Sequence, residues 1–558
     1  MGCMARDIHT PHRVACGRLP SVKRALLLLP FLVLDASAAV SPHAIAAHIR
    51  FLASDALEGR ETGTRGYDTA AAYVAAQFEA VGLETVGGSW MQPLKLRGAA
   101  IEEASSSIAI DGAMLVSRKD YILRPDFART TTDVAGPVVL AGFGVTAPEL
   151  GWDDYRTVDV RGKIVLLLSG APASFAVDQR AYYSAGDVKR KNATLHGAVA
   201  VLTLSSIGDE KRYPFAKRAA QSSATSMVYL APDGTPSGVT PSLRAQATLS
   251  RQAADRLFAG APTTLETVLA DAEQGVAHSM PLKTSVAIHT ASNFSEVSSA
   301  NVVGLLRGRG AALRNEYVVV TAHLDHLGNH PPAGGGDGLY NGAMDNGVGI
   351  AVLIEMARAM SQRPRGERSV LFVALTAEEK GEQGSEFFVH FPPVNADAIV
   401  ADVNMDMFSI LYPVADVAPL GGEHSDLGAL AARAARETGF EVSPDPLPEE
   451  VRFIRSDQYS FVKAGIPAIH IKAGNRSTNP AVDGAKVTRD WLRTIYHSPK
   501  DDLSQHFDFA SGARYAELNQ RLVEAIASGP RPRWKSGDFF GGLFAHPTGR
   551  KATITLRH

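Results

Sequence analysis

Two short apolar runs in the middle of the chain have the character of buried strands. Tyr317 to Thr321 is a β-branched and aromatic run bounded by polar residues and too short for a helix, and Val370 to Leu375 is a second such run. Between them, apolar residues recur at helical spacing from Asn346 to Met360. The pattern predicts a strand, a helix and a second strand of a mainly parallel sheet.

Polar side chains gather where these three elements begin and end. One group follows the first strand, one residue immediately precedes the helix, and a pair of carboxylates follows the second strand. In chain order these residues are His323, Asp325, His326, Asp345, Glu378 and Glu379. Because ligands and catalytic groups of open α/β sheets collect at the carboxyl ends of the strands, this edge is the predicted functional site.

The alternation of strands and helices extends along most of the chain. A helix is predicted around Tyr67 to Val81, where apolar residues share one face and Gly82 closes the helix. Further strands and helices are predicted at Ala300–Leu306, Ala398–Met407, Asp426–Thr438, Ala468–Ile471 and Ala510–Ile526. The fold class is therefore α/β, a three-layer domain around a mixed, mainly parallel central sheet.

A β-rich insertion interrupts this pattern. From about Leu96 to Leu282, short β-type runs alternate with turns of Gly, Pro and Asp, and no cluster of titratable residues recurs. We expect a discontinuous catalytic domain at residues 41–100 and 285–530, an inserted domain at 101–284 with a structural or substrate-steering role, and a carboxyl-terminal tail at 531–558. The loop Gly59 to Thr64 is expected to be a surface connection rather than part of a site.

The amino terminus has the pattern of a secretory signal. Basic residues precede the apolar run Ala25 to Leu34, and the small residues Ala36 to Ala38 offer a cleavage site, which predicts a signal peptide at residues 1–38. Both cysteines, Cys3 and Cys16, lie within it, so the rest of the chain has no disulfide framework and no thiolate ligand. Export of such a chain fits a bacterial periplasm or the medium.

Composition limits the partners. The chain of 558 residues, with 45% hydrophobic and 20% charged residues, is ordinary for a globular protein of two or three domains. A formal charge of -2 gives no electrostatic reason to expect a nucleic acid. After removal of the signal, no stretch is apolar enough for stable insertion into a membrane.

Five residues have the chemistry of a two-metal site. Hydrolases bind divalent metals through imidazole nitrogen and carboxylate oxygen, and two adjacent metals need a bridging carboxylate. The chain supplies His323, Asp345, Glu379, Asp406 and His497, each at a strand end or in a loop. The Asp325 carboxylate, two residues after His323, can fix the tautomer of its imidazole. Of the pair Glu378 and Glu379, one can bind metal while the other acts as a general base.

Six ordered motifs resemble the co-catalytic di-zinc aminopeptidase family, whose relatives include glutamate carboxypeptidase II, glutaminyl cyclase and the transferrin receptor. The motifs are TAHLDHLG, GAMDNGVG, TAEEKGEQGS, NMDM, RSDQYSFVKAGIPAI and YHSPKDDL. They span nearly all of Ala300 to Ile526, and FLASDALEGRETGTRG is similar to the start of bacterial members. The resemblance implies a phosphorylase/hydrolase-like zinc-peptidase domain with a protease-associated domain inserted in it.

The resemblance also implies a role for each residue. Asp345 would bridge two zinc ions, with Co²⁺ or Mn²⁺ as substitutes; His323 and Asp406 would complete one site, and Glu379 and His497 the other. Glu378 would be the base and Tyr496 would hydrogen-bond the oxyanion. Substrate contacts are expected from Arg455, Ser456 and Asp457. Gln458 stands where the family often has histidine, which puts in doubt any contact from that position.

The expected activity is hydrolysis of the amino-terminal peptide bond of peptides or proteins by a metal-activated water. A carboxypeptidase or dipeptidase of the same fold remains an alternative, since Arg452 and Arg455 would suit a substrate carboxylate. A glutaminyl cyclase is a second alternative, although it typically works with one zinc. A non-catalytic receptor or binding module is the alternative of another class, and it would be expected to lack an intact ligand set.

Overall fold

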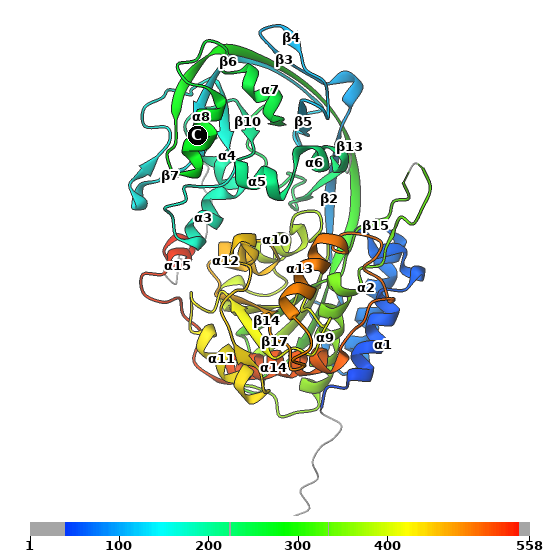
Figure 1. Ribbon diagram of the computed structural model, residues 1–558. Coiled ribbons are helices and arrows are strands. Elements are labelled where there is room, and N and C mark those ends of the chain that lie inside the picture. Colours follow the sequence, from blue (N-terminus) through cyan, green and yellow to red (C-terminus); the bar gives the residue numbers. More distant parts are fainter. Residues whose placement is uncertain (1–38, 223–224, 333, 546–558) are drawn as a thin grey trace, which may run out of the picture. The chain divides into compact units, whose positions relative to one another are not determined.

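The structure is a computed structural model that describes residues 39–222, 225–332 and 334–545. The predicted signal peptide at residues 1–38 lies outside this part of the chain. No helix among the described residues is long and apolar enough to cross a membrane. The predicted α/β class is confirmed by a sheet with helices on both faces (Figure 1).

Four parallel strands form the centre of the sheet that carries the site. β17 (Ser369–Leu375), β14 (Tyr317–His323), β18 (Ile399–Asn404) and β21 (Ala468–Ala473) lie side by side in this order. The antiparallel strands β13 (Ser279–Leu306) and β19 (Asp416–Leu420) flank them. The sheet is therefore mixed and mainly parallel at its centre, as the sequence predicts.

Side chains alternate between the two faces of this sheet. Val318, Val320 and Phe372 belong to the larger hydrophobic core, whereas Val319 and Leu371 belong to a second core on the opposite face. The helices of the larger core are α1 (Pro42–Leu52), α2 (Arg65–Ala80), α9 (Val348–Ser361), α11 (Leu427–Glu437), α13 (Gly484–Thr494) and α14 (Phe509–Ser528). Those of the second core are α10 (Gln383–His390), α12 (Gln458–Lys463) and α15 (Phe539–Phe544).

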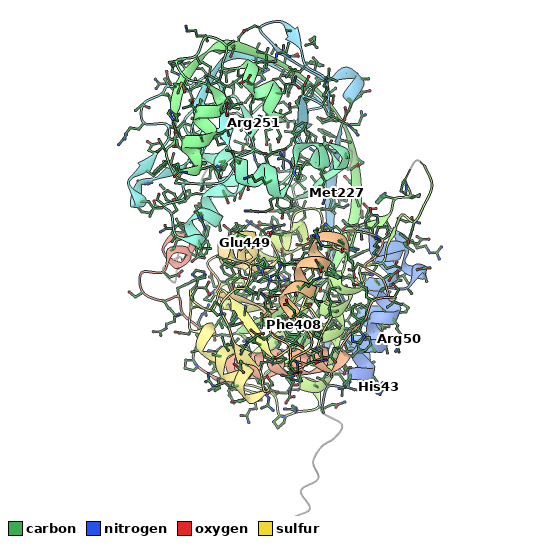
Figure 2. All side chains as sticks on the ribbon, viewed as in Figure 1. His43, Arg50, Met227, Arg251, Phe408 and Glu449 are labelled. Carbon is green, nitrogen blue, oxygen red and sulfur yellow. The ribbon has the colours of Figure 1, made fainter. Side chains whose placement is uncertain are left out.

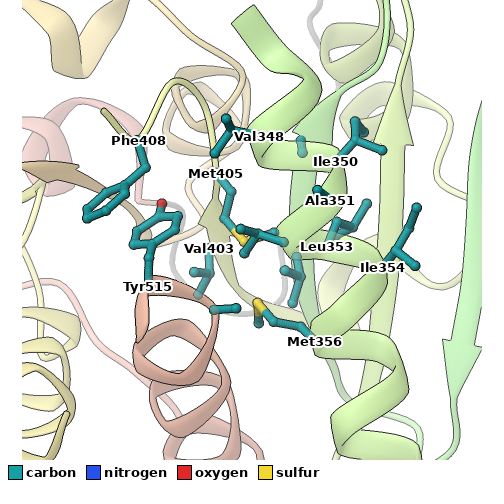
Figure 3. Packing of buried hydrophobic residues seen from close by; sticks show 14 of the residues in the cluster. Val348, Ile350, Ala351, Leu353, Ile354, Met356, Val403, Met405, Phe408 and Tyr515 are labelled. Carbon is teal, nitrogen blue, oxygen red and sulfur yellow. The ribbon is translucent and has the colours of Figure 1, made fainter. Parts of the chain in front are cut away.

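Helix α9 is apolar nearly all round because it is covered on every side. Its side chains from Val348 to Met360 are buried, with Arg358 the least enclosed, and they pack against Met405 beyond the end of β18 (Figure 3). Phe408, labelled in Figures 2 and 3, stacks on Tyr515 of α14 with ring centroids 3.8 Å apart. This packing fixes the start of α9, which directly follows the turn that carries Asp345.

The inserted region contains more helix than the sequence predicts. Its strands β6 (Thr131–Ala141), β9 (Ile164–Leu168), β10 (Ala200–Leu204) and β12 (Ala245–Leu249) are parallel. They are covered by short helices such as α4 (Gly186–Leu195) and α8 (Leu265–Glu273), and they have hydrophobic cores of their own. Short helices give a weak periodic signal in the sequence. The available clue to α8 was Thr264, a residue type that favours helix starts, and its hydroxyl accepts a hydrogen bond from the amide of Thr267.

Strand β13 belongs to both regions. It pairs with β6 over residues 279–291, with β2 (Met91–Ile101) over 292–302 and with β17 over 302–306. The boundary expected between residues 284 and 285 falls inside this continuous strand, so it remains a prediction. In the expected tail, residues 539–544 form α15, whose Phe540 side chain is fully buried.

Candidate metal centre

Three strand ends bring the predicted groups to one edge of the sheet. His323 is the last residue of β14, Glu378 and Glu379 follow β17, and Asp406 lies two residues beyond β18. Because these strands are parallel neighbours, their carboxyl ends meet at the same edge. The site forms here because polar residues stand at the end of each of these buried strands or within four residues after it.

Asp345 is presented by a tight turn before α9. The turn is η4 (Ala343–Gly347), and the Asp345–Asn346 peptide bond in it is cis. Gly342 precedes it with φ of 61°, and a Cβ there would lie 2.3 Å from the backbone oxygen of Asp345, so only glycine fits. The Asp501 carboxylate accepts hydrogen bonds from the amides of Met344 at 2.9 Å and Asp345 at 3.0 Å. Asp501 thereby fixes the direction of Asp345.

The two oxygens of Asp345 face two different imidazoles. Oδ1 lies 3.3 Å from Nε2 of His323, and Oδ2 lies 3.2 Å from Nε2 of His497. On the far side, His323 Nε2 is 3.5 Å from Oδ1 of Asp406, and His497 Nε2 is 3.2 Å from Oε2 of Glu379. The structure therefore brings together all five predicted ligands, with Asp345 between the two pairs.

These separations fit metal ligands better than hydrogen bonds. Donors bound tetrahedrally at about 2.0–2.1 Å from a zinc ion lie about 3.3 Å apart, whereas N–H···O bonds cluster near ~2.9–3.0 Å. Oδ1 of Asp406 is buried and has no hydrogen-bond partner within the described part of the chain. Imidazole nitrogen with carboxylate oxygen suits zinc and also accepts cobalt or manganese. The residues present therefore fit a pair of divalent cations.

The electrostatics of the site favour positive charge. Burial works to lower the pKa of His323, but Glu378 and Asp345 hold it well above the usual value. Burial likewise opposes protonation of His497, yet Glu379 and Asp345 raise its pKa to about 10. The converse holds for Glu379, whose pKa falls to about 2 because His497 outweighs the effect of burial. Such a cluster of carboxylates needs cations to offset it.

Glu378 differs from its neighbour. Burial raises the pKa of its carboxyl well above the usual value, and the nearby Glu379 adds to this rise. Of the two adjacent carboxylates, Glu379 therefore prefers to be ionised and Glu378 prefers to take up a proton. That division matches the one predicted between a ligand and a base.

His326 is a sixth member of the cluster that the sequence analysis left without a role. Its ring is fully buried, and its Nδ1 lies 2.8 Å from Oε1 of Glu379 and 3.9 Å from Oδ2 of Asp345. The shorter distance is that of a hydrogen bond, so His326 orients Glu379. Its position three residues after His323, in the motif TAHLDHLG, was the available signal.

Asp325 acts through different atoms from those expected. The Nδ1 of His323 pairs with the backbone oxygen of Asp325 at 3.1 Å rather than with its carboxylate. The carboxylate instead accepts hydrogen bonds from the amides of Glu378 at 3.1 Å and Glu379 at 3.2 Å, and from the Thr62 hydroxyl at 3.1 Å. Asp325 thus positions both an imidazole and the glutamate pair.

The expectation that Gly59 to Thr64 is a surface connection is wrong. Arg60 is 1% exposed and donates hydrogen bonds to the backbone oxygens of Leu324 at 3.0 Å, Asn341 at 2.6 Å and Gly342 at 3.1 Å. The loop therefore lies under the metal centre and braces the chain on both sides of it. The small and charged residues of this loop suggested exposure to solvent. One sequence does not show that the backbone oxygens of Leu324, Asn341 and Gly342 face Arg60 in the folded protein.

Lys472 and His470 of β21 fix the position of Asp406 through its backbone oxygen. Both are buried, and both donate to the backbone oxygen of Asp406, Lys472 at 2.5 Å and His470 at 2.8 Å. Burial lowers the pKa of His470 to about 3, so its ring is neutral. In the sequence these residues stand at alternate positions of the strand and gave no sign of this role.

The three residues expected to contact substrate lie in different surroundings. Ser456 and Asp457 are buried at 1% and 0% exposure, and the Ser456 hydroxyl accepts a hydrogen bond from the Asn404 amide at 2.9 Å. Only Arg455 has an exposed side chain, and it pairs with Glu450 at 3.3 Å. Asn404 also binds Oε1 of Gln458 at 2.7 Å, so position 458 anchors the loop from inside.

Tyr496 lies directly against the cluster. Its ring stacks on His497 with centroids 3.8 Å apart. Burial, and then the charges of Asp345 and Glu379, raise the pKa of its hydroxyl well above the usual value. The phenol therefore stays protonated and can donate a hydrogen bond next to the metal ligands.

Comparison with known proteins relates part of the chain to a family of peptidases. Residues 301–523 match the model of peptidase family M28. Aminopeptidase YwaD of Bacillus subtilis (strain 168) is 27% identical over 231 residues, covering 41% of this chain and 46% of that protein. A glutamate carboxypeptidase 2 homolog of Caenorhabditis elegans is 27% identical over 260 residues, covering 40% of this chain and 30% of its own. The chain thus spans less than half the length of these curated relatives.

Among solved structures, the aminopeptidase from Aneurinibacillus sp. strain AM-1 has a TM-score of 0.52 at 20% sequence identity, covering 88% of this chain and 95% of that one. At this identity the likeness concerns the fold. The segment that is similar to peptidase family M28 contains His323, Asp345, Glu379, Asp406 and His497.

Proposed function

We propose that this protein is a zinc-dependent aminopeptidase, which hydrolyses the amino-terminal peptide bond of peptides or proteins. The observation that carries the proposal is the placement of Asp345, whose two oxygens face His323 at 3.3 Å and His497 at 3.2 Å. An arrangement with one carboxylate between two ligand pairs is typical of two-metal hydrolases.

Five side chains would hold the two ions. His323 and Asp406 would bind one ion, Glu379 and His497 the other, and Asp345 both. When bound, two such ions supply an activated water and Lewis-acid polarisation of the scissile carbonyl. Asp325 and Asp501 accept hydrogen bonds from the backbone amides of Glu379 and Asp345, and His326 hydrogen-bonds the Glu379 carboxylate. These contacts hold the ligands in place before any substrate arrives.

Glu378 would move the proton and Tyr496 would stabilise the developing charge. Glu378 has a pKa raised by burial, so it can take the proton of the attacking water and pass it to the leaving amine. The Tyr496 hydroxyl keeps its proton and lies beside His497, where it can donate to the oxyanion.

The rival activities have less support. A carboxypeptidase would need free cationic groups for the substrate carboxylate, but Arg452 is paired with Asp445, and Arg455 with Glu450 at 3.3 Å. A non-catalytic receptor would have no need of an intact ligand set. A glutaminyl cyclase, typically served by one zinc, would not need both pairs of ligands around Asp345.

We place the enzyme in the bacterial periplasm or the medium, in line with the signal pattern of residues 1–38. Its partner would be a peptide or protein with a free amino terminus.

A substrate panel tests the activity. Aminoacyl chromogenic substrates should be hydrolysed, the same substrates with a blocked amino group should not, and a chelator should abolish turnover until zinc is restored. Faster hydrolysis of N-blocked peptides with an acidic carboxyl terminus would overturn the aminopeptidase assignment in favour of the carboxypeptidase. Absence of turnover on every member of the panel, with metal bound, would favour the receptor.

A further inference from the structure

A second cluster of metal-ligating side chains lies apart from the metal centre. His424 and Glu423 stand in the loop between β19 and α11, and Asp178 comes from α3 (Val177–Ser184) of the inserted region. Asp538 immediately precedes α15 and contacts the same imidazole. Three regions distant in the sequence therefore meet at one histidine.

The His424 ring is arranged as a metal ligand is. It is 2% exposed, and its Nδ1 lies 2.7 Å from Oδ2 of Asp538. Its Nε2 is buried, points toward the two other carboxylates and has no hydrogen-bond partner among the described residues. A ligating histidine commonly donates its other ring N–H to a carboxylate, which fixes the tautomer and makes the free nitrogen more basic.

The distances leave room for an ion and are too long for hydrogen bonds. Nε2 of His424 lies 3.8 Å from Oδ2 of Asp178 and 3.7 Å from Oε1 of Glu423. Two donors that each bind an ion at about 2.0–2.2 Å are at most ~4.4 Å apart. The three ligand atoms all lie within 4.8 Å of one another, so small rotations of the two carboxylate side chains would bring them to one cation.

We propose that His424 Nε2 and the carboxylates of Asp178 and Glu423 bind a divalent transition cation such as Zn²⁺, separate from the metal centre. Imidazole nitrogen and carboxylate oxygen both bind zinc, and water would complete the coordination. The Asp178 and Glu423 side chains are 36% and 58% exposed, so the ion exchanges with solvent. Its role is structural, because its ligands join the inserted region to the loop after β19.

The ion would reinforce an aromatic contact between the same three regions. Phe540 of α15 lies with its ring centroid 4.9 Å from that of His424, and Phe539 lies 5.7 Å from Tyr182 of α3. Coordination of the cation would link the same three segments that these aromatic contacts already join. Binding should then hold α3 and α15 to the loop after β19.

The rival account is an ion pair without a metal. In it, a protonated His424 would simply neutralise the surrounding carboxylates, which already act to raise its pKa against the effect of burial. Only the metal-binding account predicts a zinc ion at His424. Zinc content is therefore the measurement that separates the two accounts.

The test is elemental analysis of the full chain after equilibration with Zn²⁺ as the only metal. We expect His424→Gln and Glu423→Gln each to contain one zinc equivalent fewer than the wild type, with hydrolytic activity retained. His289→Gln is the matched control, because His289 also pairs with an aspartate at 2.7 Å but has no further carboxylate in a ligating group. It should keep the wild-type zinc content.

Glu423→Gln guards against a folding artefact, because its exposed side chain can be changed without opening the core around His424. Thermal unfolding gives the second readout: zinc should raise the Tm of the wild type more than that of Glu423→Gln. The proposal is overturned if both variants carry as much zinc as the wild type. That outcome would leave the metal centre and the proposed activity untouched, since none of these residues belongs to them.

Discussion

The chain contains two sets of parallel strands, and polar groups at their carboxyl ends are used in opposite ways. In the inserted region the buried Lys189 amine donates to the backbone oxygen of Leu168 at 3.1 Å and to that of Phe143. The Asp154 carboxylate accepts from the amides of Phe143 and Val145, each at 3.0 Å. Here the charged groups are committed to the backbone.

In the catalytic region the side chains at the same kind of edge face one another. The imidazole of His323 has carboxylates at 3.3 Å and 3.5 Å, and Nε2 of His326 and Oδ1 of Asp406 have no hydrogen-bond partner in the part of the chain that the structure describes. Native proteins rarely leave buried polar atoms unpaired without a reason. Both edges carry polar groups at the ends of parallel strands. The functional edge is therefore marked by buried polar atoms that lack hydrogen-bond partners among the described residues, more than by its position on a sheet.

The largest effect that would sharpen this contrast is the loss of Asp345. Asp345→Ala should weaken the binding of both ions at once. It should lower kcat/KM by more than the roughly 100-fold loss typical of residues that only hydrogen-bond the ligands. Elemental analysis and steady-state kinetics measure it. The matched change in the other region, Lys189→Met, should leave metal content and kcat/KM unchanged; an equal loss in both variants would remove the distinction between the two edges.

A smaller effect is expected at Asp325. Asn at this position offers one acceptor where two amides, those of Glu378 and Glu379, now bind. We expect Asp325→Asn to reduce metal affinity or activity by about 10–100-fold. Thr62→Val removes only a hydroxyl donor to the same carboxylate, so titration with zinc should find a weaker effect. If Asp325→Asn bound zinc as the wild type does, the carboxylate would have no part in positioning the site.

The smallest effect concerns stability and pH in the inserted region. Burial lowers the pKa of Lys189 from 10.5 to about 7 in the folded protein. Between these values the unfolded chain keeps a proton that the folded chain has lost, so the free energy of unfolding rises with pH, at most by about 1.4 kcal/mol per pH unit.

Lys189→Met should abolish this rise. Denaturant unfolding at pH 7.5 and 9.5 compares the two proteins, and activity serves as the control. A wild type whose stability attributable to Lys189 stayed constant over this range would show that the amine stays charged when buried.

Much of the fold was predictable because strong periodic patterns coincide with buried elements. The predicted strand Tyr317 to Thr321 extends to His323 in β14, and the predicted helix Asp426 to Thr438 is α11 within one residue at each end. The five proposed ligand positions could be singled out from the sequence because each ends a strand or lies in a loop, where a charged residue has no role in packing.

The supporting contacts were not predictable from one sequence. Arg60 and Asp501 act on backbone groups more than 150 residues away, at Gly342 and Met344 respectively. Both residues lie in motifs quoted above, but their type and spacing do not tell which groups they contact. Their roles depend on which backbone atoms face them after folding, and no periodicity encodes that.

The central claim is that a base distinct from the ligands acts at a two-metal site, and Glu378→Gln tests it most directly. Metal content and turnover are measured on the same preparation. The account predicts a metal content equal to that of the wild type, with kcat reduced by roughly 10²- to 10⁴-fold. Unchanged metal content with near-normal turnover would contradict it, because Glu378 would then have no part in moving the proton.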